Sequence, residues 1–261
     1  MMKKQTTKDL DSYLDLESIV NTLMGPGGCP WDKQQTHESL KKNLLEECYE
    51  LLEAIDNKDS KNIAEELGDI LLQIALHIHL GTNNGEFKKQ DVFNHINNKL
   101  IRRHPHVFGD NEAETTEEVK QNWENIKQKE RGDSSRLSGI PANLPALAYS
   151  QLVQERASMA GFDWNGLEGP LDKIVEEISE FNEAKTEFEH QWEIGDILFS
   201  VVNLGRWINL SAEESLRLTN KRFSRRFEFM ENKCKELGLD FISLNMESKE
   251  ELWKEAKAEV G

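Results

Sequence analysis

Acidic residues three positions apart occur as pairs in both halves of the chain, within segments whose apolar residues have helical spacing. These pairs are Glu47 with Glu50, Glu66 with Asp69, Glu177 with Glu180, and Glu193 with Asp196. On a helix, residues at this spacing lie on one face with β-carbons about 5–6 Å apart, so each pair presents two carboxylates side by side. Carboxylate oxygens suit Mg²⁺, Mn²⁺ or Ca²⁺ better than zinc or copper. We therefore treat these eight residues as candidate metal ligands, with Mg²⁺ as the expected ion and Mn²⁺ as a substitute.

A solvated acidic surface is the alternative interpretation of these pairs, and it is the usual one for a single pair on a helix. Here the pairs recur together and lie directly beside apolar residues, which favours metal binding. Magnesium held by a few carboxylates commonly grips substrate phosphates. An acidic protein of this kind could therefore bind a polyanionic substrate through its metal.

The acidic pairs belong to a longer internal repeat. Residues 41–50 (KKNLLEECYE) align with 171–180 (LDKIVEEISE), 65–72 (EELGDILL) with 192–199 (WEIGDILF), and 99–103 (KLIRR) with 222–226 (RFSRR). Three blocks in the same order indicate a duplicated unit of at least three helices.

The expected fold class is all-α. Apolar residues recur at helical spacing over 37–56 and about 62–80, whereas alternating runs typical of strands are hard to find. A further helix is expected around 116–130, capped by Thr115 or Thr116 with Glu118 behind it. We place the boundary between the units in the segment 131–145, giving an N-terminal domain with its linker helix at 1–134 and a C-terminal domain at 135–261.

The composition excludes several classes of function. The 261 residues carry a net charge of −16, so nucleic acid is not an expected partner. No apolar run reaches the roughly 20 residues of a membrane span, and the acidic N-terminus does not resemble a signal peptide. The three cysteines, without a CxxC pair, favour a reducing compartment. We expect a cytoplasmic protein without a membrane partner.

Several other residues have two interpretations. Lys173 is one turn before Glu177 and is placed either to reach a phosphate or to pair with that acid. The basic pairs Lys99 with Arg103, and Arg222 with Arg226, would neutralise phosphate charge or form salt bridges to acidic helices.

Glycines and one tryptophan complete the structural expectations. A glycine interrupts both ExGD segments, at Gly68 and Gly195, and close approach of a neighbouring helix would explain it. The GPGGCPW segment lacks the lysine of a phosphate-binding loop and is interpreted as a structural turn that packs Trp31.

These features together resemble the MazG family of nucleoside triphosphate pyrophosphohydrolases. The resemblance rests on the tandem EExxE and ExxD motifs together with GCPWD, RRHPHVF, SGIPANLPAL and GFDW, and runs from about residue 13 to 257. It implies helical units that assemble into four-helix-bundle-like arrangements, with a homodimer as the expected state. It also implies Mg²⁺-dependent hydrolysis of a nucleoside triphosphate to the monophosphate and pyrophosphate, which would clean or regulate the nucleotide pool.

The resemblance also assigns roles to residues, chiefly in the C-terminal unit. Glu177, Glu180, Glu193 and Asp196 are implied as the metal ligands, and Glu176 as a further ligand or the base that orients water, so that Glu176, Glu177 and Glu193 are the catalytic candidates. Lys173, Arg222 and Arg226 match positions that contact the triphosphate, and Trp253 matches a tryptophan near the nucleotide. The N-terminal unit keeps Glu46, Glu47, Glu50, Glu66 and Asp69.

This sequence departs from the family pattern in both units. Trp192 and Glu189 stand where relatives often carry an acid and a lysine, and Asn43 stands where the C-terminal unit has Lys173. We expect the C-terminal unit to be the main catalytic one. The alternative is a non-catalytic regulatory module that binds nucleotide or magnesium, and a third interpretation is a helical scaffold with solvated acidic faces.

Overall fold

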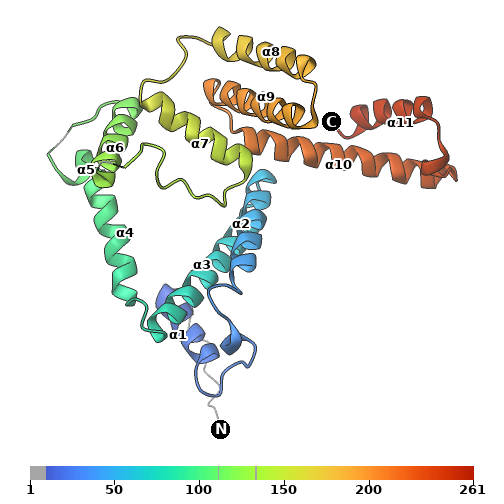
Figure 1. Ribbon diagram of the computed structural model, residues 1–261. Helices are drawn as coiled ribbons and strands as arrows, with labels where there is room; N and C mark the ends of the chain where they lie inside the picture. The colour runs from blue at the N-terminus through green and yellow to red at the C-terminus, as the bar shows by residue number, and fades with distance from the viewer. Residues whose placement is uncertain (1–9, 111, 133) are drawn as a thin grey trace. The chain divides into compact units, whose positions relative to one another are not determined.

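The computed structural model describes residues 10–110, 112–132 and 134–261, and the regular elements in these ranges are all helices (Figure 1). The chain divides after Glu130 into two compact units, which we call the N-unit and the C-unit. The N-unit contains α1 (Tyr13–Met24), a 3₁₀ turn η1 (Asp32–Gln34), α2 (Lys41–Asp56), α3 (Ser60–Asn83), α4 (Lys89–Arg103), α5 (Pro105–Phe108) and α6 (Thr116–Arg131). The C-unit contains α7 (Ala146–Met159), α8 (Glu168–Glu183), α9 (Glu187–Trp207), α10 (Ala212–Leu237), a 3₁₀ turn η2 (Phe241–Ser243) and α11 (Met246–Glu259). The all-α prediction is confirmed.

The repeated sequence blocks lie on helices that occupy the same order in each unit. They fall on α2 and α8, on α3 and α9, and on α4 and α10. Packing follows the same scheme, because α3 packs against α1 and α2 while α9 packs against α7 and α8. The antiparallel pairs α2–α3 and α8–α9 therefore place the ExxE and ExxD motifs on neighbouring helices.

Capping side chains explain where several helices begin. Ser12 and Asp15 form a reciprocal capping box at α1, and Thr186 and Glu189 form another at α9. The Thr115 hydroxyl accepts from the Glu118 amide at 3.2 Å, which confirms one of the two expected caps of α6. Each such cap contributes about 1 kcal/mol to the stability of its helix.

The helix expected from residue 37 starts later. Thr36 and Ser39 exchange backbone-to-hydroxyl hydrogen bonds of 2.9 and 3.1 Å, and these hold a turn ahead of α2. Hydroxyl groups that bond the nearby backbone compete with the helix in this way. The helix therefore begins at Lys41.

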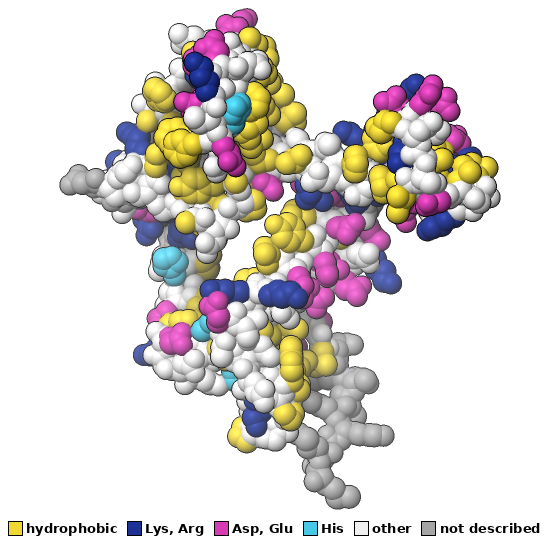
Figure 2. Space-filling model, turned by 45° about the vertical axis from the view of Figure 1, so that its right-hand side comes forward, with side chains coloured by type: hydrophobic (Ala, Val, Ile, Leu, Met, Phe, Trp, Pro, Cys, Tyr) yellow, Lys and Arg dark blue, Asp and Glu magenta, His cyan; other side chains and the backbone are white. Residues whose placement is uncertain are grey.

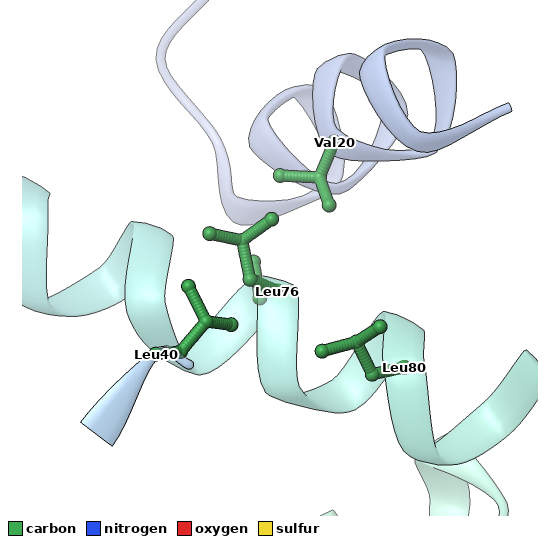
Figure 3. Close-up of a cluster of buried hydrophobic side chains, with 5 residues drawn as sticks. Val20, Leu40, Leu76 and Leu80 are labelled. Carbon is green, nitrogen blue, oxygen red and sulfur yellow. The ribbon is translucent and has the colours of Figure 1, made fainter. Parts of the chain in front are cut away.

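The N-unit core lies where α1, the start of α2 and α3 meet (Figure 3). Val20 and Leu40 are each 1% exposed and pack with Ala75, Leu76 and Leu80 of α3. Truncating a leucine buried to this degree costs about 2–5 kcal/mol, so this cluster fixes the position of α3 and its carboxylates.

In the C-unit, Asp163 of the GFDW motif links the α7–α8 loop to the end of α9 by hydrogen bonds. Asp163 accepts hydrogen bonds from two nitrogens of Arg206, at 2.6 and 2.9 Å, and from the indole of Trp207 at 3.1 Å. A second core joins α10 to α11 through Met230, Cys234, Leu252 and Ala256. These contacts position α9 and the C-terminal helix pair.

Two structural expectations are wrong. GPGGCPW does form a turn, in which a β-carbon at Gly28 would lie 2.1 Å from the Leu23 carbonyl oxygen, but Trp31 is 60% exposed and does not pack into it. At Gly68 and Gly195, a β-carbon would meet nothing within 4 Å. No neighbouring helix of the described chain therefore accounts for these two glycines.

Large areas of the surface are hydrophobic (Figure 2). On α8 and α9 the exposed apolar side chains include Leu171, Val175, Ile178, Ile194, Leu198 and Val201. On α2 and α3 they include Leu45, Leu52, Ile55, Leu67, Leu71 and Ile74. Among the described residues, no helix has the length and apolar character needed to cross a membrane.

Candidate functional site

The C-unit cluster lies between α8 and α9. Glu177, Glu180 and Glu193 each place a carboxylate oxygen within 4.8 Å of the others. Glu177 is only 4% exposed, Glu193 is half-buried and Glu180 is exposed, so the cluster opens to solvent on one side. Burial, and then the charge of Glu177, raises the pKa of Glu180.

One carboxylate oxygen of this cluster has no partner. The Oε2 atom of Glu193 is buried and has no hydrogen-bond donor among the described residues. Such an atom carries a desolvation penalty that a hydrogen bond or a cation would remove. An all-oxygen donor set with one uncompensated oxygen fits a hard dication such as Mg²⁺. Asp196 is exposed, one turn after Glu193, and lies outside the group of three.

Lys173 is the cation nearest to this cluster. Its Nζ atom lies 2.7 Å from a carboxylate oxygen of Glu176 and 2.7 Å from one of Glu177. The hydrogen bond to Glu176, and then the one to Glu177, raises the pKa of Lys173, which therefore stays charged at neutral pH. Of the two interpretations of Lys173, the structure shows the ion pair, and it also brings Glu176 to the edge of the cluster.

Three acids also come together between α2 and α3 in the N-unit, but they are not all the repeat counterparts of the acids in the C-unit cluster. Glu47, Glu66 and Asp69 are half-buried, and each places an oxygen within 4.8 Å of the others. Glu50 is exposed and outside the group of three. The Oε2 atom of Glu66 is buried without a donor among the described residues, as is that of its repeat counterpart Glu193.

The electrostatics of the N-unit cluster are less balanced. Burial, followed by the charges of Asp69, Glu50 and Glu46, raises the pKa of Glu47. Burial, followed by the charges of Glu50, Asp69, Glu47 and Glu65, raises the pKa of Glu66. Asn43 carries no charge where Lys173 does, and the nearby Lys42 pairs with Glu46 at 3.3 Å, away from the three clustered acids.

The residues expected to contact the nucleotide lie on α10 and α11. The guanidinium of Arg226 is 5.7 Å from the ring centroid of Trp253, and its Nε and Nη2 atoms donate to the Gly261 oxygen at 3.1 and 2.7 Å. Arg222 lies one turn before Arg226 and donates to the Thr219 hydroxyl at 3.4 Å. Among the described residues, no hydrogen bond or ion pair joins Arg222, Arg226 or Trp253 to the carboxylates of α8 and α9.

One of the two departures at the start of α9, Glu189, has a local explanation. Glu189 is the third residue of the helix and accepts from the Lys185 and Thr186 amides at 2.8 and 2.9 Å, which lowers its pKa. A lysine there would lose this cap. Trp192 is exposed and lies 5.1 Å from the Phe188 ring.

An arginine–tryptophan cluster in the N-unit is not predicted from the sequence. Arg103 of α4 lies over the ring of Trp123 of α6 and forms an ion pair with Glu130. The sequence singles out the basic pair Lys99 with Arg103, but not Trp123 or Glu130. The alignment of 99–103 with 222–226, extended to the next tryptophan in each unit, would have indicated Trp123, but no sequence signal indicates Glu130.

Comparisons with known proteins identify the family. Residues 35–108 match the MazG nucleotide pyrophosphohydrolase domain. The chain is 46% identical over 247 residues to the nucleoside triphosphate pyrophosphohydrolase/pyrophosphatase MazG of Thermotoga maritima, covering 94% of this chain and 95% of that protein. It is 40% identical over 255 residues to the nucleoside triphosphate pyrophosphohydrolase of Escherichia coli K12, covering 93% of this chain and 95% of that protein. This chain therefore belongs to the MazG family of nucleoside triphosphate pyrophosphohydrolases.

Proposed function

We propose that this protein hydrolyses nucleoside triphosphates to the nucleoside monophosphate and pyrophosphate, with the C-unit as the main catalytic unit. Full-length similarity to two pyrophosphohydrolases supports the reaction. The observation that carries the assignment to the C-unit is the contact of Lys173 with Glu176 and Glu177 at the edge of the carboxylate cluster. This arrangement combines metal ligands, a fixed cation and a solvent-accessible carboxylate.

Glu177, Glu180, Glu193 and Asp196 are the proposed Mg²⁺ ligands, with Mn²⁺ as a substitute. The unpartnered Glu193 Oε2 and the all-oxygen donor set support this choice. When bound, Mg²⁺ supplies charge neutralisation and polarisation of the phosphate oxygens. Glu47, Glu50, Glu66 and Asp69 are proposed to bind the same ion in the N-unit.

The catalytic side chains divide the remaining work. Glu176 is exposed and is proposed to accept the proton of the attacking water, while buried Glu177 holds Lys173 in place. The water oxygen forms a bond to one of the two phosphorus atoms of the anhydride that joins the α- and β-phosphates. That anhydride bond breaks, and the monophosphate and pyrophosphate separate. Lys173, Arg222 and Arg226 would stabilise the negative charge on the phosphates, and Trp253 would stack on the nucleotide.

A homodimer is the proposed assembly. Exposed leucine, isoleucine and valine side chains on α8 and α9 form an apolar surface that a single C-unit leaves in water. Pairing with the same helices of a second copy would give a four-helix bundle. Light scattering coupled to gel filtration tests this, since twice the 30.1 kDa chain mass supports the dimer and the chain mass alone would contradict it.

A nucleotide- or magnesium-sensing role is the second candidate, and it applies to the N-unit. Asn43 stands at the position equivalent to Lys173, so the N-unit lacks the lysine that would contact a triphosphate. It keeps three clustered carboxylates. The protein is proposed to act in the cytoplasm on free nucleotides and not on nucleic acid, which its net charge of −16 would repel.

Product analysis by ³¹P NMR tests the proposed reaction. Each of the eight ordinary ribo- and deoxyribonucleoside triphosphates is incubated with the protein, with Mg²⁺ and with chelator. Appearance of monophosphate and pyrophosphate only with Mg²⁺ supports the proposal. Diphosphate with orthophosphate, or tight binding of nucleotide with no product, would contradict it.

A further inference from the structure

The N-unit contains a counterpart of the Arg226–Trp253 pair. Arg103 aligns with Arg226 in the sequence repeat and lies in the last turn of α4. Its guanidinium is 5.5 Å from the ring centroid of Trp123 on α6, compared with 5.7 Å for Arg226 and Trp253. Each unit thus places one arginine against a tryptophan of its final helix.

The two arginines also use the same donor edge. Arg226 donates from Nε and Nη2 to the Gly261 oxygen, and Arg103 donates from Nε and Nη2 to Oε2 of Glu130, at 3.2 and 2.5 Å. In both units the tryptophan ring lies near the guanidinium group, and the Nε and Nη2 atoms of the arginine donate to one oxygen atom. A guanidinium fork of this kind matches the oxygens of a carboxylate or a phosphate.

A second arginine of the N-unit, Arg102, aligns with Arg225 of the C-unit and also contacts Glu130. Arg102 donates from Nε to Oε1 of Glu130 at 2.7 Å, so both oxygens of this carboxylate are held by guanidinium groups. These hydrogen bonds, chiefly the one from Arg103, lower the pKa of Glu130 to about 2, so the acid is ionised at neutral pH. The Arg103 side chain is 18% exposed and that of Arg102 is 56% exposed. A ligand in solution could therefore reach the two guanidinium groups and replace the Glu130 carboxylate.

We propose that Arg102, Arg103 and Trp123 form a second binding site for the phosphates of a nucleoside polyphosphate, and that Glu130 occupies this site as an internal competitor. The inference rests on the proposed function, because Arg226 and Trp253 are assigned to the nucleotide there. The carboxylate of Glu130 mimics one phosphate group, and the ligand must displace it to bind. Glu130 therefore blocks this site of the N-unit unless the nucleotide concentration is high.

A purely structural role for the same contacts makes a different prediction. Glu130 and Trp123 also attach α6 to the end of α4, and His104 stacks edge-on against Trp123 at 4.8 Å. If attachment were their whole role, replacing Glu130 would only lower stability. If Glu130 competes with a ligand, the replacement must also increase nucleotide binding.

Isothermal titration calorimetry with α,β-methylene-ATP and Mg²⁺ distinguishes the two roles on the full chain. This analogue keeps the triphosphate charge but carries carbon in place of the bridging oxygen that the enzyme would cleave. We expect the wild-type chain to bind one molecule in the C-unit, and Glu130→Gln to bind a second. The glutamine keeps the length and one acceptor oxygen of Glu130, which preserves a bond to one arginine while removing the competing charge.

Matched variants define the outcomes. Glu114→Gln makes the same chemical change at an exposed position outside the cluster and is expected to keep the wild-type stoichiometry. Adding Trp123→Ala to Glu130→Gln is expected to remove the second binding event. Equal stoichiometry in wild type and Glu130→Gln, at one or at two molecules per chain, would overturn the inference. Failure of the proposed function is distinguishable, because it would appear as absence of monophosphate and pyrophosphate in the ³¹P NMR assay and would leave the gain in binding caused by Glu130→Gln unchanged.

A measurement on the wild-type chain covers the case in which Glu130→Gln does not fold. The indole ¹⁵N–H signal of Trp123, assigned with Trp123→Phe, should shift as millimolar analogue displaces Glu130, after the C-unit has been filled. A signal that does not move across this range would overturn the inference.

Discussion

The N-unit and the C-unit each place three carboxylates within 4.8 Å of one another on a packed helix pair, but they balance the charge differently. In the C-unit, Lys173 lies 2.7 Å from both Glu176 and Glu177. In the N-unit the equivalent position is the uncharged Asn43, and burial together with neighbouring carboxylates raises the pKa values of Glu47 and Glu66. One amino-acid difference one turn before the ExxE motif thus separates a cluster that contacts a lysine from one with an uncharged asparagine at the equivalent position.

The arginine–tryptophan pairs show the opposite balance. In the N-unit, two arginines are neutralised by Glu130, whereas in the C-unit Arg226 contacts an oxygen of Gly261 and Arg222 contacts a hydroxyl. The N-unit therefore has uncompensated acids and a compensated cationic pair. The C-unit cluster contacts Lys173, and Arg222 and Arg226 contact a hydroxyl and an oxygen of Gly261 in place of a side-chain carboxylate, which suits an incoming triphosphate.

The largest expected effect is loss of turnover in Glu177→Gln. This change removes a metal ligand and the partner of Lys173, so we expect kcat to fall by more than the about 10–100-fold that loss of an outer-shell partner costs. Pyrophosphate release under saturating Mg²⁺ measures it. The repeat counterpart, Glu47→Gln, should change kcat little, and an equal loss in both variants would remove the distinction between the units.

Lys173→Asn converts the C-unit to the N-unit pattern. We expect kcat/KM to fall by about 10–100-fold, because a hydrogen bond to a charged group contributes about 1.5–3 kcal/mol. Steady-state kinetics at several substrate concentrations measures it. A variant that kept the wild-type kcat/KM would show that Lys173 serves Glu177 alone.

Magnesium should stabilise both units, and each carboxylate variant should remove one part of that effect. At an ion concentration of 100 times Kd, the expected gain is about 2.7 kcal/mol per independent site. Thermal unfolding with Mg²⁺ and with chelator measures it, using Glu66→Gln and Glu193→Gln to separate the sites. No Mg²⁺-dependent change in any of the three proteins would support the solvated acidic surface.

The pH dependence of stability should reveal the unbalanced N-unit acids. The pKa values of Glu47 and Glu66 are raised in the folded protein. Between the unfolded pKa of about 4.3 and these raised values, the two side chains therefore bind more protons in the folded than in the unfolded state. Stability should therefore fall as pH rises through this window in the presence of chelator. Thermal unfolding of wild type and Glu66→Gln across this range measures the difference, and identical slopes would show that Glu66 is not a source of the pH dependence.

The smallest expected effect is that of Asn43→Lys. A lysine at this position lies four residues before Glu47 and adds a helical ion pair of about 0.2–0.5 kcal/mol. The melting temperature in chelator should rise slightly, and the stabilisation by Mg²⁺ should become smaller. A larger Mg²⁺ effect in the variant would contradict the idea that this position balances the cluster.

Sequence periodicity predicts the parts of the molecule that depend on local order. Helical periodicity, and the repeat that links Glu66 with Glu193, lead to helix pairs that bring acids together, although Glu50 and Asp196 lie outside the groups of three. Thr115 is predictable as a cap because Glu118 follows it at the spacing of a capping box. Each of these inferences involves residues within one turn or one aligned block.

Contacts between distant residues are beyond such reasoning. Glu130 lies 27 residues from Arg103, and nothing local in either segment connects them. Gly68 and Gly195 suggest a close helix, but whether space is filled depends on tertiary packing. Lys173 has two interpretations in the sequence because the choice depends on the rotamer of a flexible side chain.

The most direct test of the proposed division between units is pyrophosphate release by Glu193→Gln and Glu66→Gln, measured side by side with wild type in Mg²⁺. The two variants remove equivalent carboxylates, each with a buried Oε2 atom that has no donor among the described residues. We predict that Glu193→Gln abolishes release and that Glu66→Gln keeps most of it. Release that persists in Glu193→Gln and disappears in Glu66→Gln would contradict the assignment and move catalysis to the N-unit.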